Sequence, residues 1–548
     1  MLIGISDFKT QVEKGYYVDK TPILDELAAR IDTSTGVIIN RPRRFGKSLM
    51  LSMIDAFFNQ RYDNRELFAS LAVSSSSTMR YRNAFPVINL SFKNVAGANV
   101  EDVLPAFKTA LADLYRSHQA DVYGFLGAEQ KRFYDAIVRG EATLSEYASS
   151  LHSLCSFVFA ACGKKPIVLI DEYDAPIERV FDERSYGEVV DFLKALFVAA
   201  FKDVSDYSFA VLTGVFSITK GTLGSGLNNL PVDSAVSRCF SKNYFGFNEA
   251  DMDRLCRDFA IPEPERENLR QYYGGYVFAG EEVYNPWSVL NYVESRDYAT
   301  YWNMSGSNAT FSKALGKSGL MSEETLLALL QEGQTVHLDP SSSYDTIYSS
   351  SSNLILYLVM AGYFTLRKDG LADYFVYPPN LETRYAFLEE IKKKYRDQDG
   401  LNRIAGIRLA FLRGDADRLA SQIKNVLLSS LSYYDFTSEK NYRIMVGTML
   451  ALAFSDCRCK CEVIAGTGRC DILIQNRSSG TFGAVIEIKY HASPVSATRL
   501  LASAERALSQ IEKKDYLDEL IHADAKPIYA YGFAFMKNKV AVQSKKIR

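Results

Sequence analysis

A short apolar segment runs directly into a loop that ends in Gly-Lys-Ser, and a helical pattern follows the loop. The apolar segment is residues 36–40 (GVIIN), the loop is residues 41–48 (RPRRFGKS), and residues 49–58 carry apolar side chains at helical spacing. A strand, such a loop and a helix together form a phosphate-binding loop, because the N–H groups and the dipole at the helix start favour an anion. This order predicts an α/β P-loop domain with a parallel sheet flanked by helices.

All eight loop residues are predicted to bind the nucleotide: Arg41, Pro42, Arg43, Arg44, Phe45, Gly46, Lys47 and Ser48. Lys47 would reach the β- and γ-phosphates of ATP, and the Ser48 hydroxyl would bind Mg²⁺. Arg41 stands where the general motif has its first Gly, so the turn there is expected to differ from the usual one.

Two further buried strands are predicted to end in polar residues beside this loop. Residues 166–170 (PIVLI) lead into Asp171 and Glu172, and residues 209–213 end in Thr213. A carboxylate at the tip of a parallel strand next to a P-loop holds Mg²⁺, and the next carboxylate polarises the attacking water. We assign Asp171 to the metal and Glu172 to the general base. The strand that ends in Thr213 is expected to lie between the other two as a sensor strand.

A second group of charged residues lies near the carboxyl end. Asp471 and Glu487 fall in apolar segments, 471–474 and 484–489, that are predicted to be strands. Successive strand residues point to opposite faces, so Glu487 and Lys489 share one face. Two carboxylates and a lysine are the equipment for phosphodiester hydrolysis: Asp471 and Glu487 would bind Mg²⁺, and Lys489 would orient the water or offset charge. Glu462, on the strand before, is a candidate third acidic group.

Several motifs occur together in a way that resembles a known family. The chain is similar to bacterial AAA-ATPase-like proteins with a C-terminal PD-(D/E)xK nuclease-like domain, on the motifs YYVDKT at 16–21, RPRRFGKS at 41–48, LIDEYD at 169–174, LTGV at 212–215, SGLNN at 225–229 and YNPW at 284–287. An Arg at the first loop position is usual in that family. The resemblance places Gln510 on a helix toward the nuclease active site. Relatives commonly have His where this chain has Arg443, so the resemblance implies that an auxiliary contact is changed and the metal site is not.

The resemblance and the patterns together predict four regions. They are an AAA-ATPase-like core at 1–247, a helical lid at 248–300, a linking helical and winged-helix-like region at 301–430, and a restriction-endonuclease-like α/β domain at 431–548. The last has the predicted element order α-β-β-β-α-β, and an amphipathic pattern predicts its first helix at 439–453.

Three features of the predicted regions had two interpretations each. In the linking region, a helix at 354–361 and a hairpin at 363–377 suggest a DNA-docking winged helix, and a structural spacer is the alternative. Arg238 is a candidate arginine finger, with a surface ion pair as the alternative. Cys457, Cys459, Cys461 and Cys470 invite a zinc site, but alternate strand residues lie about 6.6 Å apart, which favours core packing.

Composition agrees with an ordinary globular protein. Hydrophobic residues make up 47% of the 548 residues and charged residues 23%, and the net charge is −2. Without a global basic field, nucleic acid must be bound by local patches. No apolar segment is long enough to span a bilayer, so we expect a cytoplasmic protein that does not bind membranes.

The function expected from these residues is ATP binding and hydrolysis coupled to a Mg²⁺-dependent nuclease that hydrolyses DNA. One alternative is an ATP-driven regulatory switch whose nuclease-like domain only binds nucleic acid or a partner. A third hypothesis, an AAA-type remodelling assembly, predicts ATP-dependent homo-oligomers.

Overall fold

The computed structural model describes residues 2–95, 100–180, 186–218, 229–302, 321, 329–330, 333–339, 342–370, 372–394, 398–429, 438–454, 457–465, 468–476, 482–514, 516–522 and 524–548. The chain forms two compact units. One comprises Met1–Ala314 and Thr335–Arg384, and the other comprises Leu315–Gln334 and Tyr385–Arg548. The predicted linking region at 301–430 is therefore divided between the units, and the predicted domain boundaries remain predictions.

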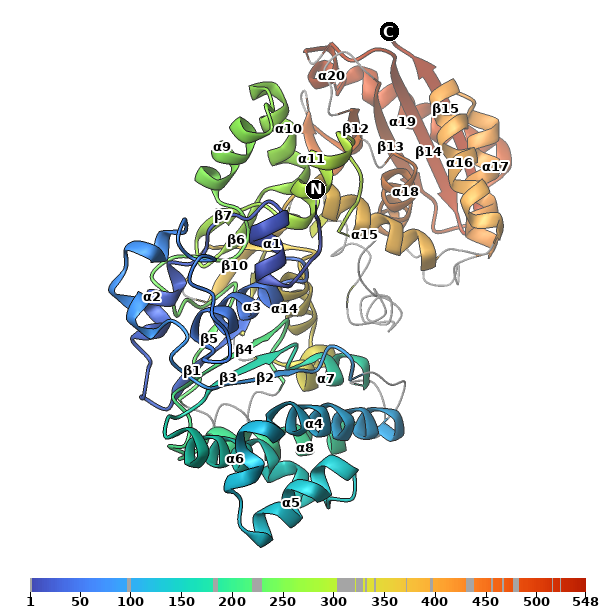
Figure 1. The fold of residues 1–548 in the computed structure, drawn as a ribbon. Helices are drawn as coiled ribbons and strands as arrows, with labels where there is room; N and C mark the ends of the chain where they lie inside the picture. The colour runs from blue at the N-terminus through green and yellow to red at the C-terminus, as the bar shows by residue number, and fades with distance from the viewer. Residues whose placement is uncertain are drawn as a thin grey trace. The chain divides into compact units, whose positions relative to one another are not determined.

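The first unit is built on a parallel sheet with the strand order β2-β3-β4-β1-β5 (Figure 1). Its strands are β1 (Thr35–Asn40), β2 (Val87–Ser91), β3 (Ile167–Asp171), β4 (Phe209–Gly214) and β5 (Val232–Asp233). β4 lies between the strand before the loop and the strand that ends in Asp171, as predicted. The central strands are buried on both faces, which is expected where helices cover both sides of a parallel sheet.

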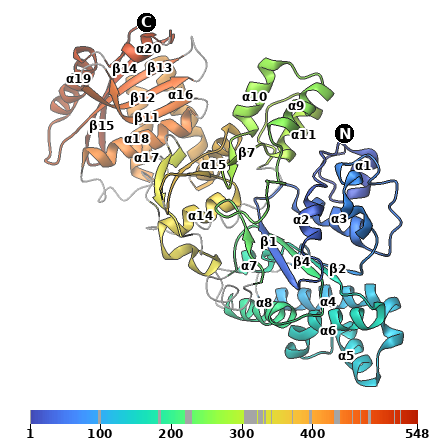
Figure 2. The same ribbon diagram turned by 90° about the vertical axis from the view of Figure 1, so that its left-hand side faces the viewer.

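Helices cover this sheet on both faces, as Figures 1 and 2 show. One face packs against α1 (Phe8–Lys14), α2 (Ile23–Ala28) and α3 (Lys47–Phe58), whose apolar residues form one cluster with those of β1, β3 and β4. The other face carries α4 (Val100–Val122), α6 (Leu144–Cys162) and α8 (Tyr186–Phe201), with α5 (Ala128–Arg139) packed outside them and α7 (Ala175–Val180) beside α8.

A small helical subdomain follows the sheet. It contains α9 (Glu249–Asp258), α10 (Glu263–Tyr273), the hairpin β6 (Tyr276–Phe278) and β7 (Glu281–Val283), and α11 (Pro286–Ser295). The Asn285 side chain caps α11 by accepting hydrogen bonds from the N–H groups of Trp287 and Ser288. Tyr273, Tyr276 and Tyr284 are buried, so these motif aromatics belong to the core.

The predicted helix and hairpin of the linking region are present as α14 (Ser351–Ala361), β9 (Thr365–Lys368) and β10 (Asp373–Tyr377), and β8 (Gln334–His337) adds a third strand. However, every residue from 354 to 360 is buried. α14 therefore offers no face to a DNA groove, and the docking role suggested for it is wrong. Its nearly continuous apolar sequence is typical of a helix surrounded by protein.

Helix α15 (Leu381–Lys394) begins in the first unit and continues in the second. Glu382 in its first turn is fully buried: its carboxyl accepts hydrogen bonds from the Ser288 hydroxyl at 2.9 Å and from the Trp302 N–H at 2.8 Å.

The second unit contains a mixed sheet in the order β11-β12-β13-β14-β15, in which only β13 and β14 pair in parallel. Its elements are α16 (Gln398–Arg413), α17 (Ala416–Ser429), α18 (Glu439–Ala453), β11 (Cys457–Ala465), β12 (Gly468–Asn476), β13 (Gly483–Tyr490), α19 (Ala497–Lys513), α20 (Asp518–His522), β14 (Ile528–Met536) and β15 (Lys539–Lys546). The predicted α-β-β-β-α-β order is confirmed, and β15 extends it.

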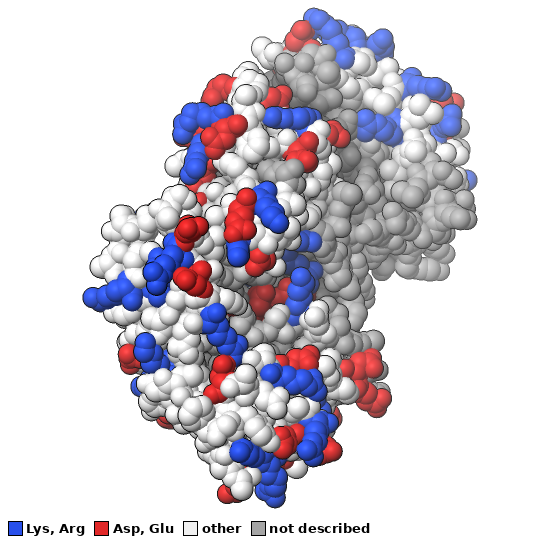
Figure 3. All heavy atoms as spheres, in the orientation of Figure 1, with Lys and Arg blue, Asp and Glu red and all other residues white. Residues whose placement is uncertain are grey.

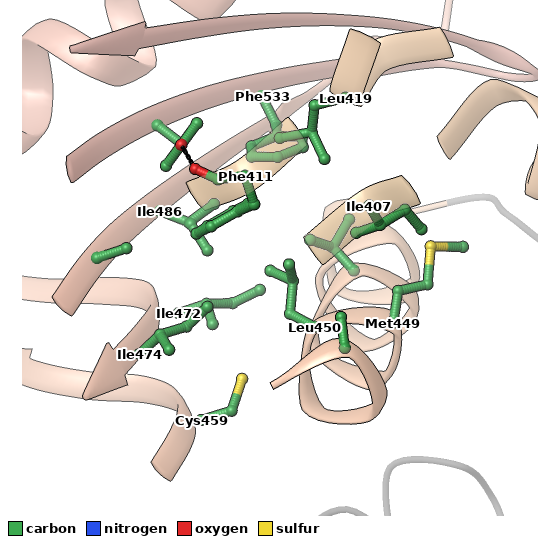
Figure 4. Packing of buried hydrophobic residues seen from close by; sticks show 14 of the residues in the cluster. Ile407, Phe411, Leu419, Met449, Leu450, Cys459, Ile472, Ile474, Ile486 and Phe533 are labelled. Carbon is green, nitrogen blue, oxygen red and sulfur yellow. Dashed lines mark hydrogen bonds between the residues drawn. The ribbon is translucent and has the colours of Figure 1, made fainter. Parts of the chain in front are cut away.

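The main core of this unit lies between the sheet and helices α16, α17 and α18 (Figure 4). Ile486 and Ile488 face this core, which leaves Glu487 and Lys489 on the opposite side of β13. Cys457 and Cys459 are buried in the same core, as predicted for them. α19 packs on the opposite face.

Basic and acidic side chains lie interspersed on the face of the first unit that Figure 3 shows, in keeping with the small net charge. Across the described residues, no helix is both long enough and apolar enough to cross a membrane.

Candidate functional site

The phosphate-binding loop follows β1 and ends at Gly46, whose φ of 86° lies in the left-handed region that favours glycine. α3 then begins at Lys47, and Ser48 lies half-buried in its first turn. The buried Lys47 ammonium donates hydrogen bonds to the carbonyl oxygens of Arg41 and Pro42, both at 2.9 Å. Burial lowers the pKa of Lys47, and the charges of nearby carboxylates oppose that effect. The loop thus curls around the Lys47 ammonium group.

The carboxylates predicted to serve this loop lie at the end of β3. The Thr213 hydroxyl, at the end of β4, donates a 2.6 Å hydrogen bond to Asp171 Oδ1. Glu172 follows with a φ of 52°, an uncommon conformation for a residue with a side chain. Burial, together with the charge of Asp171, raises the pKa of Glu172, which moves it toward the range of a general base. The structure therefore brings Lys47, Asp171, Glu172 and Thr213 to one edge of the sheet.

Asp174 lies just beyond these two carboxylates and is buried. Its Oδ2 accepts hydrogen bonds from the N–H groups of Val215 and Phe216, at 2.9 and 2.8 Å, and from the Tyr344 hydroxyl at 3.1 Å. Asp174 thus holds the segment after β4, and its charge also acts on the buried Lys47 ammonium.

The Arg41 side chain turns away from the loop interior. Its guanidinium forms a buried ion pair with Asp233 of β5 at 2.5 Å and lies over the rings of Phe245 and Phe278, at 5.2 and 5.0 Å. The carbonyl group of Arg41 is the part that faces Lys47. The contribution of Arg41 to the loop is therefore made by its backbone.

The other loop side chains contact distant segments that the sequence did not connect with them. Arg43 pairs with both oxygens of Glu178, at 2.8 and 2.6 Å, and the Arg44 guanidinium lies 4.2 Å from the Trp287 ring centre. Phe45 packs edge-on against Tyr276, with 4.9 Å between the ring centres.

Pro42 lies against Gly362, where a Cβ atom would come within 2.8 Å of the proline ring. Tyr276 belongs to the YYGGY segment at 272–276 and Trp287 to the YNPW segment at 284–287. Through these two residues, both segments pack against the phosphate-binding loop.

An apolar cavity of about 90 Å³ lies beside the start of α3. Its lining includes Tyr17, Val18, Gly46, Met50, Phe247 and Leu290. The motif at 16–21 supplies part of this wall, and its Lys20 forms a 2.6 Å ion pair with Asp251 of α9.

In the second unit, Asp471 and Glu487 lie on adjacent strands. The antiparallel register that pairs Ile472 with Ile486 places them side by side, and both are buried. Asp471 Oδ2 accepts a 2.7 Å hydrogen bond from the N–H of Ile488, and its Oδ1 accepts one at 3.0 Å from the Arg443 guanidinium.

The Glu487 carboxylate has two unequal oxygens. Oε1 accepts hydrogen bonds from Lys489 Nζ at 2.9 Å and from the Gln510 amide, so the predicted lysine and the helix-borne Gln510 both lie in the site. Oε2 is buried without a hydrogen-bond partner. Burial and the charge of Asp471 raise the pKa of Glu487 to about 7, although Lys489 acts against them. Gly532, paired with Glu487 across β13 and β14, lets α19 approach closely, because a Cβ there would collide with the Ala504 carbonyl.

Two residues of α18 also belong to this site. Glu439 was not predicted from sequence, and Arg443 was expected to change only an auxiliary contact, whereas its guanidinium contacts the predicted metal ligand Asp471. Glu439 and Arg443 are one helical turn apart on α18, so they share a face. Burial and the charge of Asp471 raise the pKa of Glu439, and the charge of Lys489 opposes that effect. Their spacing on a predicted amphipathic helix was the signal that could have identified them.

Three of the sequence-based candidates need separate mention. The Glu462 side chain and residues 225–228 of the SGLNN motif lie outside the described part of the chain. Arg238 forms a 3.0 Å ion pair with Glu281 and donates to the Ala279 carbonyl, which agrees with the surface ion pair and not with a finger.

The carboxyl-terminal site fits a hard divalent cation. Its donors are carboxylate oxygens, which Mg²⁺ prefers, and the bare Glu487 Oε2 is a buried acceptor that a cation would satisfy. Among the described residues, no cluster of three or more His, Cys, Asp or Glu side chains could hold a metal ion. A cluster of three is not required for Mg²⁺, which proteins usually bind through one or two carboxylates with water molecules as the other ligands. Asp471 and Glu487 would be those two carboxylates.

The fold and these sites define a protein class: a P-loop ATPase of the AAA type joined to a nuclease fold of the PD-(D/E)xK type. Comparison with protein families agrees, because residues 2–224 match the family described as a predicted AAA-ATPase and residues 437–545 match the PD-(D/E)XK nuclease superfamily. An uncharacterized protein from the vnfD 5′ region of Azotobacter chroococcum mcd 1 is 30% identical over 403 residues, which cover 72% of this chain and 70% of that protein. The chain belongs to the AAA-ATPase-like family that carries a C-terminal PD-(D/E)XK nuclease domain.

Proposed function

We propose that the protein is an ATP-dependent nuclease, in which ATP binding and hydrolysis in the first unit regulate Mg²⁺-dependent hydrolysis of DNA in the second. One observation carries the nuclease part of the proposal. Glu487 is a buried carboxylate beside Asp471, and its Oε2 has no hydrogen-bond partner, so a divalent cation bound between the two carboxylates would satisfy that oxygen.

In the ATPase site, the proposed roles follow from position. The loop N–H groups at the start of α3 and the Lys47 ammonium would bind the phosphates, with Ser48 and Asp171 as Mg²⁺ ligands. Glu172 would accept a proton from the attacking water, because its raised pKa brings it closer to neutral pH. Thr213, bonded to Asp171, would keep that carboxylate in one orientation.

In the nuclease site, Asp471 and Glu487 would hold Mg²⁺, which when bound polarises the scissile phosphate and lowers the pKa of a water ligand. Lys489 is placed to offset the negative charge that develops on the phosphate, and its hydrogen bond to Glu487 fixes its direction. Gln510 orients the same carboxylate from α19.

Cleavage of supercoiled and linear DNA tests the proposal, with Mg²⁺ or Mn²⁺ and with or without ATP. We expect Lys489→Ala to lower the cleavage rate about 100-fold or more, as loss of a charge-stabilising donor does. Lys47→Ala should change only the effect of ATP on the cleavage rate and should leave cleavage without ATP as in the wild type. Lys539→Ala, which removes an exposed lysine of β15, is the matched control and should cleave like the wild type. Cleavage that is unaffected by Lys489→Ala would refute the nuclease assignment.

A second function is favoured by one observation. The Arg443–Asp471 ion pair already supplies a positive charge to a predicted metal ligand. An ATP-driven switch whose nuclease-like domain binds nucleic acid or a partner without cutting would be compatible with such a pair. Nucleotide binding without cleavage under any metal condition would support this second function.

A further inference from the structure

Arg443 lies inside the candidate nuclease site. Its guanidinium is only 14% exposed and contacts Asp471 Oδ1 at 3.0 Å, on a carboxylate whose other oxygen is bonded to the backbone of β13. Both oxygens of Asp471 therefore have a donor, whereas Glu487 keeps one bare oxygen. A cation bound by both carboxylates would share Asp471 with Arg443.

The charges around this point favour a single divalent ion. Among the side chains that the structure describes here, three carboxyl groups, those of Asp471, Glu487 and Glu439, face two cationic side chains, Lys489 and Arg443. When all five are ionised the group carries one net negative charge, and one divalent ion reverses that charge. Nucleases that use two metal ions place them about 4 Å apart between shared carboxylates. A second ion here would approach a guanidinium that is fixed on one of those carboxylates, and like charges at such distances repel strongly.

We infer that Arg443 takes the place of a second metal ion, so that the carboxyl-terminal site binds one divalent cation and the guanidinium supplies the remaining positive charge toward the phosphate. The catalytic meaning of this inference rests on the proposed nuclease function. The expected number of bound metal ions does not depend on the nuclease function, because it follows from the charges of the site.

Mn²⁺ binding to the full-length chain without nucleotide, followed by the electron paramagnetic resonance signal of free Mn²⁺, tests the inference. The wild type should bind one ion that Glu487→Gln removes. Arg443→Met removes the opposing charge, and we expect Mn²⁺ to bind at this site about tenfold more tightly or with a second ion. Arg443→Lys keeps the charge and should stay within about threefold of the wild type. Arg418→Met removes an exposed arginine of α17 and is the matched control.

A purely structural role for Arg443 predicts the opposite result. If the guanidinium only holds Asp471 in position, Arg443→Met should weaken Mn²⁺ binding, and weaker or unchanged binding would overturn the inference. Arg443→Gln serves as a second neutral variant if the Met variant does not fold, as judged by circular dichroism. If the wild type cleaves no DNA, the proposed function fails, while the Mn²⁺ titrations still decide the role of Arg443.

Discussion

Replacing Glu382 with Gln should remove much of the pH dependence of the stability of the first unit. This carboxyl, in the first turn of α15, is fully buried, and its Oε2 lacks a hydrogen-bond partner. Burial raises its pKa from 4.5 to about 8, against the lowering effect of hydrogen bonds from Trp302 and Ser288. Glu382 is therefore neutral in the folded protein at pH 7, and Gln is a neutral side chain of nearly the same shape.

The sign and size of the effect follow from proton binding. Below pH 4.5 both the folded and the unfolded chain hold the proton, so the free energy of unfolding does not change with pH through this group. Between pH 4.5 and about 8 the unfolded chain loses the proton while the folded chain keeps it, so stability falls as pH rises. At about 1.4 kcal/mol for each pH unit, the total loss is about 5 kcal/mol as an order of magnitude.

The two tryptophans make this measurement specific, because Trp287 and Trp302 are the only ones in the sequence and both lie in the first unit. Urea unfolding followed by tryptophan fluorescence at pH 7, 7.5 and 8 avoids the lower range in which burial of His118 makes stability rise with pH. Over this range the midpoint should fall for the wild type and stay more nearly level for Glu382→Gln. Glu267→Gln, which neutralises an exposed carboxylate of α10, should retain the wild-type slope. Equal slopes for the wild type and Glu382→Gln would refute the argument that Glu382 is neutral when folded.

Three further substitutions test other parts of the structure. Asp233→Ala leaves Arg41 buried without its counter-charge and should destabilise the first unit by about 3–5 kcal/mol, measured by urea unfolding; a loss below about 1 kcal/mol would contradict the buried ion pair. Trp287→Phe should remove most of any change in tryptophan fluorescence caused by ATP, because Arg44 of the phosphate-binding loop lies over that ring; an undiminished change would show that Trp302 is the reporter. Ile486→Ala should destabilise the second unit by about 2–5 kcal/mol through a core cavity, and calorimetry showing no shift in its unfolding transition would contradict the packing.

Much of the fold could be predicted from sequence because its signals are local. The apolar segments before Arg41, Asp171 and Gly214 are strands of one parallel sheet, and α18 has the bounds Glu439–Ala453 that its amphipathic pattern predicts. Alternation along β13 also placed Glu487 and Lys489 on one face. In each case the deciding residues lie within a few positions of one another.

What could not be predicted depends on pairs that are distant in sequence. The contact between Arg44 and Trp287, like the ion pair between Arg443 and Asp471, joins elements that no local pattern relates. The error over α14 has a similar cause. Its order of helix and hairpin resembles a DNA-binding unit, but only the surrounding segments determine that the helix is buried on every side.

The path of α15 limits how the two units can be exchanged as modules. One continuous helix contributes its first turn to the first unit and its remainder to the second. A cut between Arg384 and Tyr385 would leave the first unit with only the first turn of α15, which contains Glu382. The second unit would keep the rest of the helix without its first turn. Chimaeras that pair this ATPase with another nuclease should therefore keep α15 whole and join the chains beyond it.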